Sequence, residues 1–325
     1  MKKYLYIALA AVTLASCSQD DTLDAIQGEA ISFGEAFVDN ATRAADPSYG
    51  AANSLTAFKV WGSVMSAEAT PSAVAIFADD NVQGTVGTPD KTTGVNVWNC
   101  TTKTQYWIPG SKYNFAAVVN GNVTELDNNK LPKTITYTAD GTSDLLYAKS
   151  IEYTGKSINN DLVEFDFAHL LSKAKFTVTN TTTSATMYKH EIVGIKISNA
   201  YANGSYDVET EKWIASATSP QEFGSITATA ATTECEAEKL LIPGLISVKV
   251  EFTLNLYIND NGTYKLLSTT AYTGDNAKTA TITGGLLSGH AYNFGLSVGM
   301  GEVIKFTVEQ NPTWTDATGE PEITV

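Results

Sequence analysis

The chain has 325 residues, and its 35 acidic side chains against 21 basic ones give a formal net charge of −14 at pH 7. A surface this acidic repels phosphate backbones, so the composition excludes nucleic acid as a partner. Aromatic residues at 10%, 24 glycines and frequent threonine, valine and isoleucine favour strands and tight turns over helices.

The first seventeen residues have the three parts of a secretory signal. Lys2-Lys3 gives the positive start, residues 4–14 are apolar, and the small residues Ala15-Ser16 let a peptidase approach the backbone. The apolar run is much shorter than the roughly 20 residues that a membrane-spanning helix requires. We therefore expect residues 1–17 to be a signal peptide and not an ordinary membrane anchor.

The end of this signal, Leu14-Ala15-Ser16-Cys17, resembles the bacterial lipobox. The resemblance implies that the Cys17 thiol is lipidated and that Cys17 becomes the new N-terminus. Acyl chains bind firmly to a bilayer, because each buried methylene contributes about 0.8 kcal/mol. The acidic patch in Ser18-Gln19-Asp20-Asp21 resembles the signal that sends Bacteroidetes lipoproteins to the outer face of the outer membrane. The alternative is a plain secretory signal in which the cysteine occurs by chance.

A strand with one partly apolar face is expected between the signal and the body of the protein. Ile31, Phe33 and Phe37 share this face, which a glutamate interrupts. Arg43 follows as the only arginine in the chain, with small and polar neighbours typical of an exposed, cleavable segment. An arginine-specific protease would thus have one site, between Arg43 and Ala44, and its cut would sever the strand from the body. The alternative is that Arg43 is an ordinary surface residue.

The rest of the chain alternates between apolar and polar residues, with turn residues roughly every ten to fifteen positions. Many short strands and no long amphipathic helix indicate β-sandwiches. A polar segment at residues 153–161 is interpreted as a linker, so we predict an all-β fold with sandwiches at residues 44–160 and 161–325. Strands are expected at residues 55–62, 113–119, 144–149, 163–179, 191–200, 240–242, 248–258, 264–273, 278–282, 290–298 and 303–310.

No set of residues has the spacing of a catalytic or metal-binding motif. The three histidines, His169, His190 and His290, are widely separated, and His169 lies in an apolar run typical of a core position. Asp79-Asp80-Asn81 and Asp127-Asn128-Asn129 offer oxygen ligands for calcium, but both are interpreted as solvated turns. We therefore expect no enzymatic activity, no metal and no cofactor.

The cysteines leave open a disulfide, and the aromatic residues leave open a sugar-binding surface. Cys100 and Cys235 can form one disulfide in an oxidising compartment, although they fall in different predicted sandwiches. Exposed tryptophan and tyrosine can stack on sugars, but the five tryptophans are scattered along the chain and are interpreted as core residues.

Four features of the sequence belong together: the lipobox at Cys17, Ile31-Ser32-Phe33 followed by Thr42-Arg43-Ala44, Phe167-Ala168-His169-Leu170-Leu171-Ser172-Lys173, and Pro312-Thr313-Trp314-Thr315-Asp316. Together they resemble the fimbrillin family of the Bacteroidetes, the major and minor subunits of type V pili. The resemblance implies two transthyretin-like β-sandwich domains in tandem. It also implies a precursor that travels to the cell surface as a lipoprotein, from which an arginine-specific protease removes residues 18–43.

The resemblance further implies that a C-terminal segment of one subunit replaces the strand that its neighbour has lost. Residues 303–310 are expected to close the second sandwich, which leaves the tail after Pro312, with Trp314, Ile323 and Val325, as the donor. A strand added along a sheet edge satisfies the backbone and places alternate side chains in pockets. The expected partners are other fimbrial subunits, an arginine-specific protease and, through the lipid of the precursor, the outer membrane.

We therefore predict a structural subunit of surface fimbriae that contributes to adhesion. A glycan-binding surface lipoprotein is the alternative, and it would keep its N-terminus and expose an aromatic platform. A secreted hydrolase is a third reading, which would require a cleft with paired carboxylates.

Overall fold

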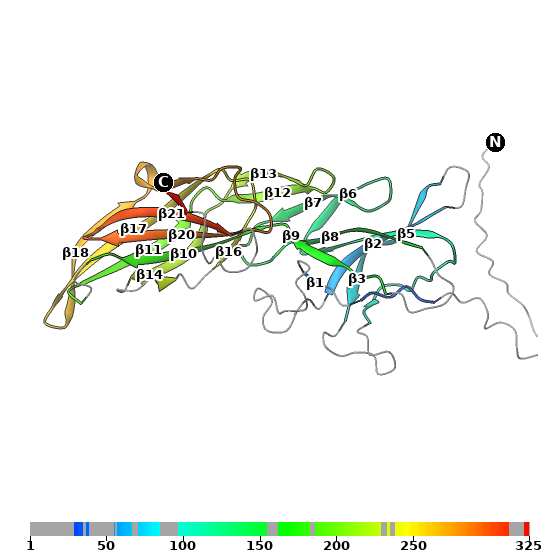
Figure 1. The fold of residues 1–325 in the computed structure, drawn as a ribbon, viewed down its shortest axis with the longest axis horizontal. Helices are drawn as coiled ribbons and strands as arrows, with labels where there is room; N and C mark the ends of the chain where they lie inside the picture. The colour runs from blue at the N-terminus through cyan, green and yellow to red at the C-terminus, as the bar shows by residue number, and fades with distance from the viewer. Residues whose placement is uncertain are drawn as a thin grey trace, which may run out of the picture.

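In the part of the chain that the computed structural model describes, the regular structure is almost entirely β-strand, arranged along one long axis (Figure 1). The prediction of an all-β fold is confirmed; the one helix of the described residues is the 3₁₀ turn η2 (Gly274–Asn276). In this part of the chain no helix has the length and apolar character that crossing a membrane requires. The structure describes residues 29–34, 37–38, 55, 57–66, 71–84, 97–154, 162–182, 186–228, 233–234, 238–311 and 322–324.

The N-terminal half is built around a sheet of seven strands. Alternate residues of its strand β5 point to opposite faces, so Tyr113, Phe115 and Ala117 join one hydrophobic cluster, and Ala116 and Val118 join another. Both faces of the sheet are therefore buried. In order across the sheet, the strands are β1 (Phe37–Val38), β9 (Asp166–His169), β8 (Leu146–Thr154), β5 (Lys112–Val119), β2 (Ala57–Met65), β3 (Ala73–Gln83) and β4 (Asn99–Cys100).

A four-stranded sheet covers one of these faces and joins the two halves of the chain. Its strand β7 comes from the first half and pairs with β12 from the second, with Tyr137 opposite Gly204. A Cβ on Gly204 would lie 2.8 Å from the Trp213 ring, so this approach requires glycine. Leu171 and Ile242 help to fill the core between the sheets. Across this sheet the strands are β13 (Lys212–Thr218), β12 (Tyr201–Asp207), β7 (Pro132–Thr138) and β6 (Asn122–Leu126).

Residues just beyond position 160 pack with the first half of the chain. β9 extends the seven-stranded sheet by pairing with β8, where His169 lies opposite Leu146. Val163, Phe165 and Phe167 are buried in the hydrophobic cluster of that sheet. The division into sandwiches at residue 160 stays a prediction; in the structure β9 still belongs to the seven-stranded sheet, and β12 and β13 later return to the sheet that covers it.

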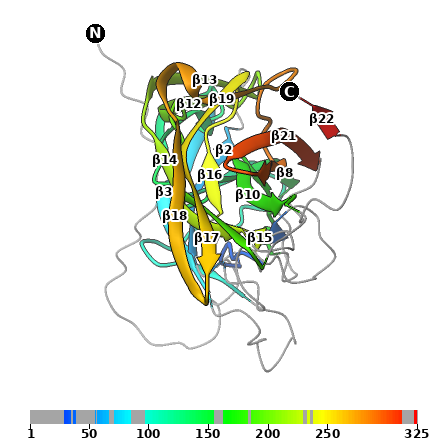
Figure 2. The same cartoon turned by 90° about the vertical axis from the view of Figure 1, so that its left-hand side faces the viewer.

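The C-terminal half is a pair of sheets, seen end-on in Figure 2, around one large hydrophobic cluster. Phe176 and Phe294 of one sheet stack with ring centroids 5.1 Å apart and face Phe223 and Phe252 of the other. The first sheet has β15 (Thr233–Glu234), β10 (Ser172–Asn180), β20 (Ala291–Gly299), β21 (Glu302–Asn311) and β22 (Glu322–Thr324) in order, with β16 (Lys239–Leu241) also on β10. The second has β14 (Gln221–Ala228), β11 (Tyr188–Ile197), β17 (Ser247–Asp260) and β18 (Thr263–Tyr272), with β19 (Lys278–Thr281) also on β17.

One histidine lies inside the C-terminal half. His190 of β11 is completely buried, and its Nε2 accepts a hydrogen bond from the Gly301 amide at 3.4 Å. Burial lowers the pKa of this imidazole below its ordinary value of 6.5, because the apolar surroundings disfavour the charged form. His190 therefore stays neutral at a pH at which an exposed histidine would begin to take up a proton.

We expect His190 to make the protein less stable in mild acid. The unfolded chain takes up this proton near pH 6.5, whereas the folded chain takes it up only at lower pH. Stability is therefore complete above about pH 6.5 and falls as the pH drops toward and through the folded pKa. Urea unfolding between about pH 7.5 and pH 5 measures this loss. His190→Gln keeps an acceptor for the Gly301 amide without titrating, so an unchanged pH dependence in this variant would contradict the prediction.

Candidate functional site

Residues 29–34 run in an extended conformation beside the chain that leads into β5. The Ile31 amide donates to the Gln105 carbonyl at 2.7 Å. The Phe33 amide donates to the Trp98 carbonyl at 2.9 Å, and the Trp98 amide donates back to the Phe33 carbonyl at 2.7 Å. These bonds secure one edge of the segment in the manner of an antiparallel pair.

The opposite edge of the segment pairs with the chain that leads into β9. The Val163 amide donates to the Ser32 carbonyl, and the Gly34 amide donates to the Val163 carbonyl, each at 2.9 Å. β1 continues this pairing in parallel with β9, where Phe37 lies opposite Asp166. Because both edges are paired, residues 29–34 form an internal strand of the N-terminal half, which we call the N-terminal strand.

Phe33 places this strand in an aromatic core. Its side chain is 0% exposed, and its ring stacks on Phe165 with centroids 6.0 Å apart. Phe58 and Phe77 meet the same ring edge-on at 6.0 and 5.7 Å. Ile31 is buried on the same face. Since full burial of one such side chain contributes about 1.5–3 kcal/mol, the N-terminal strand is a substantial part of this core.

The C-terminal tail pairs with its own half of the molecule. β22 lies antiparallel on β21, with Ile323 opposite Val308 and Thr324 opposite Thr307 (Figure 2). β20 occupies the other edge of β21. The backbone of the tail therefore covers part of an edge that would otherwise end the sheet.

The structure places some of the predicted site residues. Ile31 and Phe33 lie together in the aromatic core, and Phe37 and Ile323 lie in the paired strands β1 and β22. The roles assigned to these residues stay predictions. The other predicted site residues lie outside the described part of the chain: Cys17, Arg43, Ala44, Trp314 and Val325.

The residues that flank the N-terminal strand carry only a weak signal in the sequence. Trp98 and Trp107 are both buried, and the Trp107 amide donates to the Glu29 carbonyl at 2.9 Å. Val163 flanks the other edge and is also buried. Their apolar character indicates burial, but nothing in the local pattern indicates pairing with a strand so distant in the chain.

The described histidines take part in packing and turn formation. Nδ1 of His169 contacts the carboxylate of Asp144, and both side chains are buried, in keeping with the expected core position of His169. Nδ1 of His290 lies 2.8 Å from the carbonyl oxygen of Ser288. Among the described residues, no group of three or more histidine, cysteine or acidic side chains is arranged to hold a metal ion.

The two acidic segments considered for calcium use their oxygens within the chain. Asp80 forms an ion pair of 2.7 Å with Lys103 and accepts a 2.6 Å hydrogen bond from the Thr102 hydroxyl. Burial acts to raise the pKa of Asp80, but the hydrogen bonds from Lys103, Thr102 and the Ala78 amide bring it below the usual value. Asp127 accepts a 2.9 Å hydrogen bond from the amide four residues later. Asp80 lies within β3 and is buried, so the prediction of a solvated turn at residues 79–81 is wrong. Asp127 stabilises its own turn.

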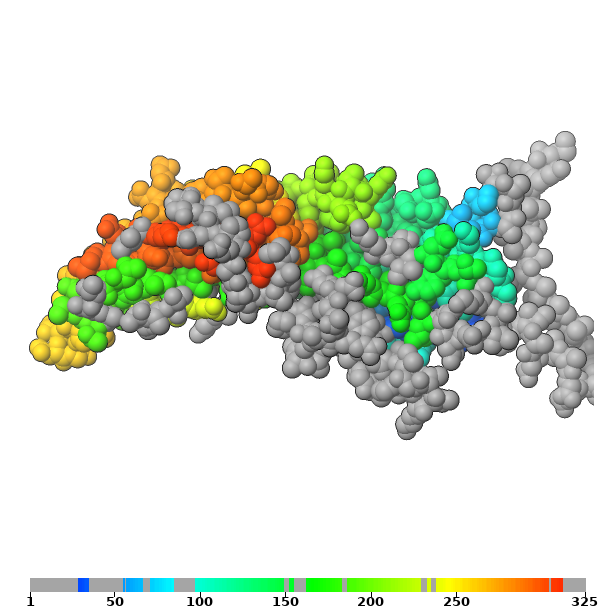
Figure 3. All heavy atoms as spheres, viewed as in Figure 1, coloured from blue at the N-terminus to red at the C-terminus, as the bar shows by residue number. Residues whose placement is uncertain are grey.

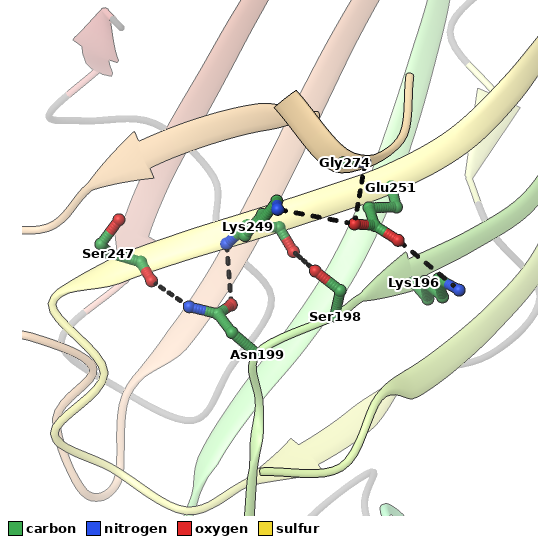
Figure 4. Close-up of polar contacts among 7 residues, drawn as sticks. All are labelled: Lys196, Ser198, Asn199, Ser247, Lys249, Glu251 and Gly274. Atoms are coloured by element: carbon green, nitrogen blue, oxygen red, sulfur yellow. Dashed lines mark hydrogen bonds and ion pairs between the residues drawn. The ribbon is translucent and has the colours of Figure 1, made fainter. Parts of the chain in front are cut away.

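A polar cluster stabilises the place where the chain leaves β11 beside β17 (Figure 4). The Asn199 side chain donates to the Ser247 carbonyl at 2.7 Å and accepts a hydrogen bond from the Lys249 amide at 2.9 Å. Glu251 lies between Lys196 and Lys249, with N–O distances of 3.6 and 3.7 Å. These groups satisfy one another, so the cluster is explained by strand packing.

The described tryptophans are packed within the protein. Trp61, Trp98 and Trp107 are buried. Trp213 is half-buried, and its Nε1 donates to the Leu170 carbonyl at 2.9 Å. None of these four forms the exposed aromatic platform that the glycan-binding alternative requires.

Cys100 is half-buried, and its sulfur lies 3.2 Å from the Thr102 hydroxyl. Cys100 forms no disulfide with any residue that the structure describes. Cys235 lies outside the described residues, so a bridge between the two cysteines stays an open alternative.

Comparisons with known proteins give matches at the level of family and of fold. A family model described as fimbrillin-like matches residues 42–312, and a model of the prokaryotic membrane lipoprotein lipid attachment site matches residues 1–18. No curated protein matches the chain.

Solved structures resemble the chain over most of its length. A fimbrial protein from Bacteroides vulgatus is 17% identical with a TM-score of 0.61, and the match covers 87% of this chain and 99% of that one. A proposed cell adhesion protein from Bacteroides uniformis is 17% identical with a TM-score of 0.49, and the match covers 88% and 99%. At 17% identity, the similarity to the Bacteroides vulgatus protein shows that the two chains share a fold.

Proposed function

The chain belongs to the fimbrillin-like family, and from that premise we propose that it is a structural subunit of cell-surface fimbriae. The precursor is carried to the outer membrane as a lipoprotein anchored at Cys17, which the lipid-attachment match supports. An arginine-specific protease then cuts after Arg43, and the mature subunits polymerise by donor-strand exchange and contribute to adhesion.

The observation that carries this proposal is the position of Phe33. A cut after Arg43 separates the N-terminal strand from the body, so the strand is then held by non-covalent contacts alone. When it leaves, Phe165 loses a stacked ring, and the backbones of Trp98 and Val163 lose their hydrogen-bond partners. An aromatic slot between two unpaired edges is the kind of site that a strand from another chain fills by β-augmentation.

The C-terminal tail is the donor in this proposal. Ile323 and Val325 alternate in the same way as Ile31 and Phe33 of the strand that leaves, so both pairs present one apolar face. In the precursor β22 lies on β21 of its own chain, so the tail must release that edge before it enters a neighbour. Such a contact joins unlike surfaces of successive subunits, so it extends into a filament and does not close.

Cleavage of the purified precursor with an arginine-specific protease tests the proposal. We expect one cut, a new N-terminus at Ala44, and oligomers on size exclusion as the N-terminal strand is exchanged. Arg43→Lys keeps the positive charge but removes the only arginine, so this variant should stay intact and monomeric. A complete cut that leaves a stable monomer contradicts donor-strand exchange. Resistance of the folded precursor contradicts maturation at Arg43.

A further inference from the structure

The molecule is elongated (Figures 1 and 3). The end of its long axis that belongs to the C-terminal half carries exposed apolar side chains. β11 begins at this end and β17 ends there, with Tyr188 opposite Ile258. The turn between β20 and β21 lies at the same end, because its Gly301 amide bonds to His190 near the start of β11. We call this end the C-terminal pole. Its large apolar side chains, between 42% and 61% exposed, are Met187, Tyr264, Leu266, Leu267 and Met300.

The opposite end of the long axis is also apolar. There β2 ends and β3 begins, with Met65 opposite Ala73, and β5 begins where β8 ends, with Lys112 opposite Thr154. We call this end the N-terminal pole. Its large apolar side chains, between 44% and 56% exposed, are Val74, Tyr106 and Ile108.

The N-terminal pole borders the start of the N-terminal strand. Tyr106 forms a β-bridge with Ala30, so it lies where that strand enters the fold. The Ile108 amide donates to the Tyr113 hydroxyl at 2.7 Å, which ties the apolar turn to β5. Tyr106 and Ile108 are therefore held in fixed positions beside the point where the N-terminal strand enters the fold.

We propose that these two poles are contact surfaces between copies of this chain, the C-terminal pole of one copy packing on the N-terminal pole of the next. The contact rests on the fimbrial assembly proposed above, because a head-to-tail array brings unlike ends together. It buries two apolar patches that solvent otherwise covers. It also adds a body-to-body surface beside the donor strand.

The direction of the C-terminal tail fits this contact. β21 begins at the C-terminal pole, next to Met300, and runs away from it. β22 is antiparallel to β21, so the tail runs back toward the C-terminal pole. A tail extended in this direction reaches a neighbour at its N-terminal pole, where the slot of the N-terminal strand begins at Ala30.

Charge at the poles also favours a second copy as the partner. The chain carries a net charge of −14, so two copies repel each other over most orientations. At the N-terminal pole Lys112 pairs with Glu152 at 3.1 Å, and at the C-terminal pole Lys265 pairs with Asp260. Each pair neutralises two charges at its pole, which lowers the electrostatic cost of bringing the two poles together.

Assembly of cleaved pole variants tests this contact. After complete cleavage at Arg43, light scattering gives the protein concentration at which oligomers form. Ile108→Asp and Leu267→Asp each place a charge in the apolar contact, and we expect each to raise that concentration about tenfold or more. Ile214→Asp is the matched control, because Ile214 of β13 is 69% exposed but lies away from both poles, and it should assemble like the unaltered protein.

A variant with opposite charges at the two poles shows whether weaker assembly comes from loss of the contact or from a damaged fold. The double variant Ile108→Asp/Leu267→Lys places opposite charges across the proposed contact, so it should assemble better than Ile108→Asp alone. Equal assembly of the pole variants and the unaltered protein overturns the pole contact but leaves donor-strand exchange standing. Absence of assembly in the cleaved, unaltered protein overturns the proposed function, and the pole contact with it.

Discussion

Replacing Phe33 by alanine is expected to lower the free energy of unfolding of the precursor by about 3–5 kcal/mol, the usual cost of removing a buried phenylalanine. The Phe33 ring meets four others, Phe58, Phe77, Phe115 and Phe165, with centroids 5.7 to 6.3 Å apart. These rings lie on strands or paired segments that cannot collapse into the cavity without breaking backbone pairing. Urea unfolding of the uncleaved precursor measures the loss.

Ser32 provides the control for this prediction. It lies on the same strand, is only half-buried, and its hydroxyl donates to the Asn99 side chain at 3.3 Å. Ser32→Ala should therefore change stability by no more than about 0.5 kcal/mol. If the two variants lost equal stability, Phe33 would not anchor the N-terminal strand. After cleavage the Phe33→Ala strand should also dissociate sooner, so oligomers should form faster than with the unaltered strand.

The fold class and the long C-terminal strands follow from alternation in the sequence. β17 alternates between buried and half-buried residues along Ser247–Asp260, close to the strand expected at residues 248–258. A sheet packed on one side imposes this period on the side chains, so the pattern is visible in a single sequence. The N-terminal strand was predicted for the same reason, because Ile31 and Phe33 share a face.

The sheet that joins the two halves has no comparable local signal. β12 (Tyr201–Asp207) and β13 (Lys212–Thr218) are short, and β13 is almost wholly polar or exposed, so neither was predicted. β12 is stabilised by pairing with β7, which lies far away in the chain, and β13 by pairing with β12. The slot around the N-terminal strand has the same origin, since Trp98 and Val163 approach it from distant segments. Such pairing depends on tertiary packing more than on local propensity.

Asp144→Ala is expected to be the second strongly destabilising change, lowering the free energy of unfolding by about 3–5 kcal/mol, as for a buried polar pair that loses one partner. The Asp144 carboxylate contacts Nδ1 of His169, and the two residues are only 6% and 2% exposed. His169 ends β9, directly before Leu170 and Leu171, which lie in the cluster shared by both halves of the chain. Loss of the carboxylate leaves a buried imidazole nitrogen without this partner at the junction.

The position of the pair predicts how the protein unfolds, as well as how much stability it loses. One hydrophobic cluster contains Tyr147 of the first half and Tyr206 of the second, so the unaltered halves should unfold in one calorimetric transition. Asp144→Ala weakens that junction and should split the transition in two. The variant Asp144→Leu/His169→Phe replaces the pair with apolar side chains, and it should recover stability and the single transition. If the double variant were as unstable as the sum of its single changes, the two residues would act independently.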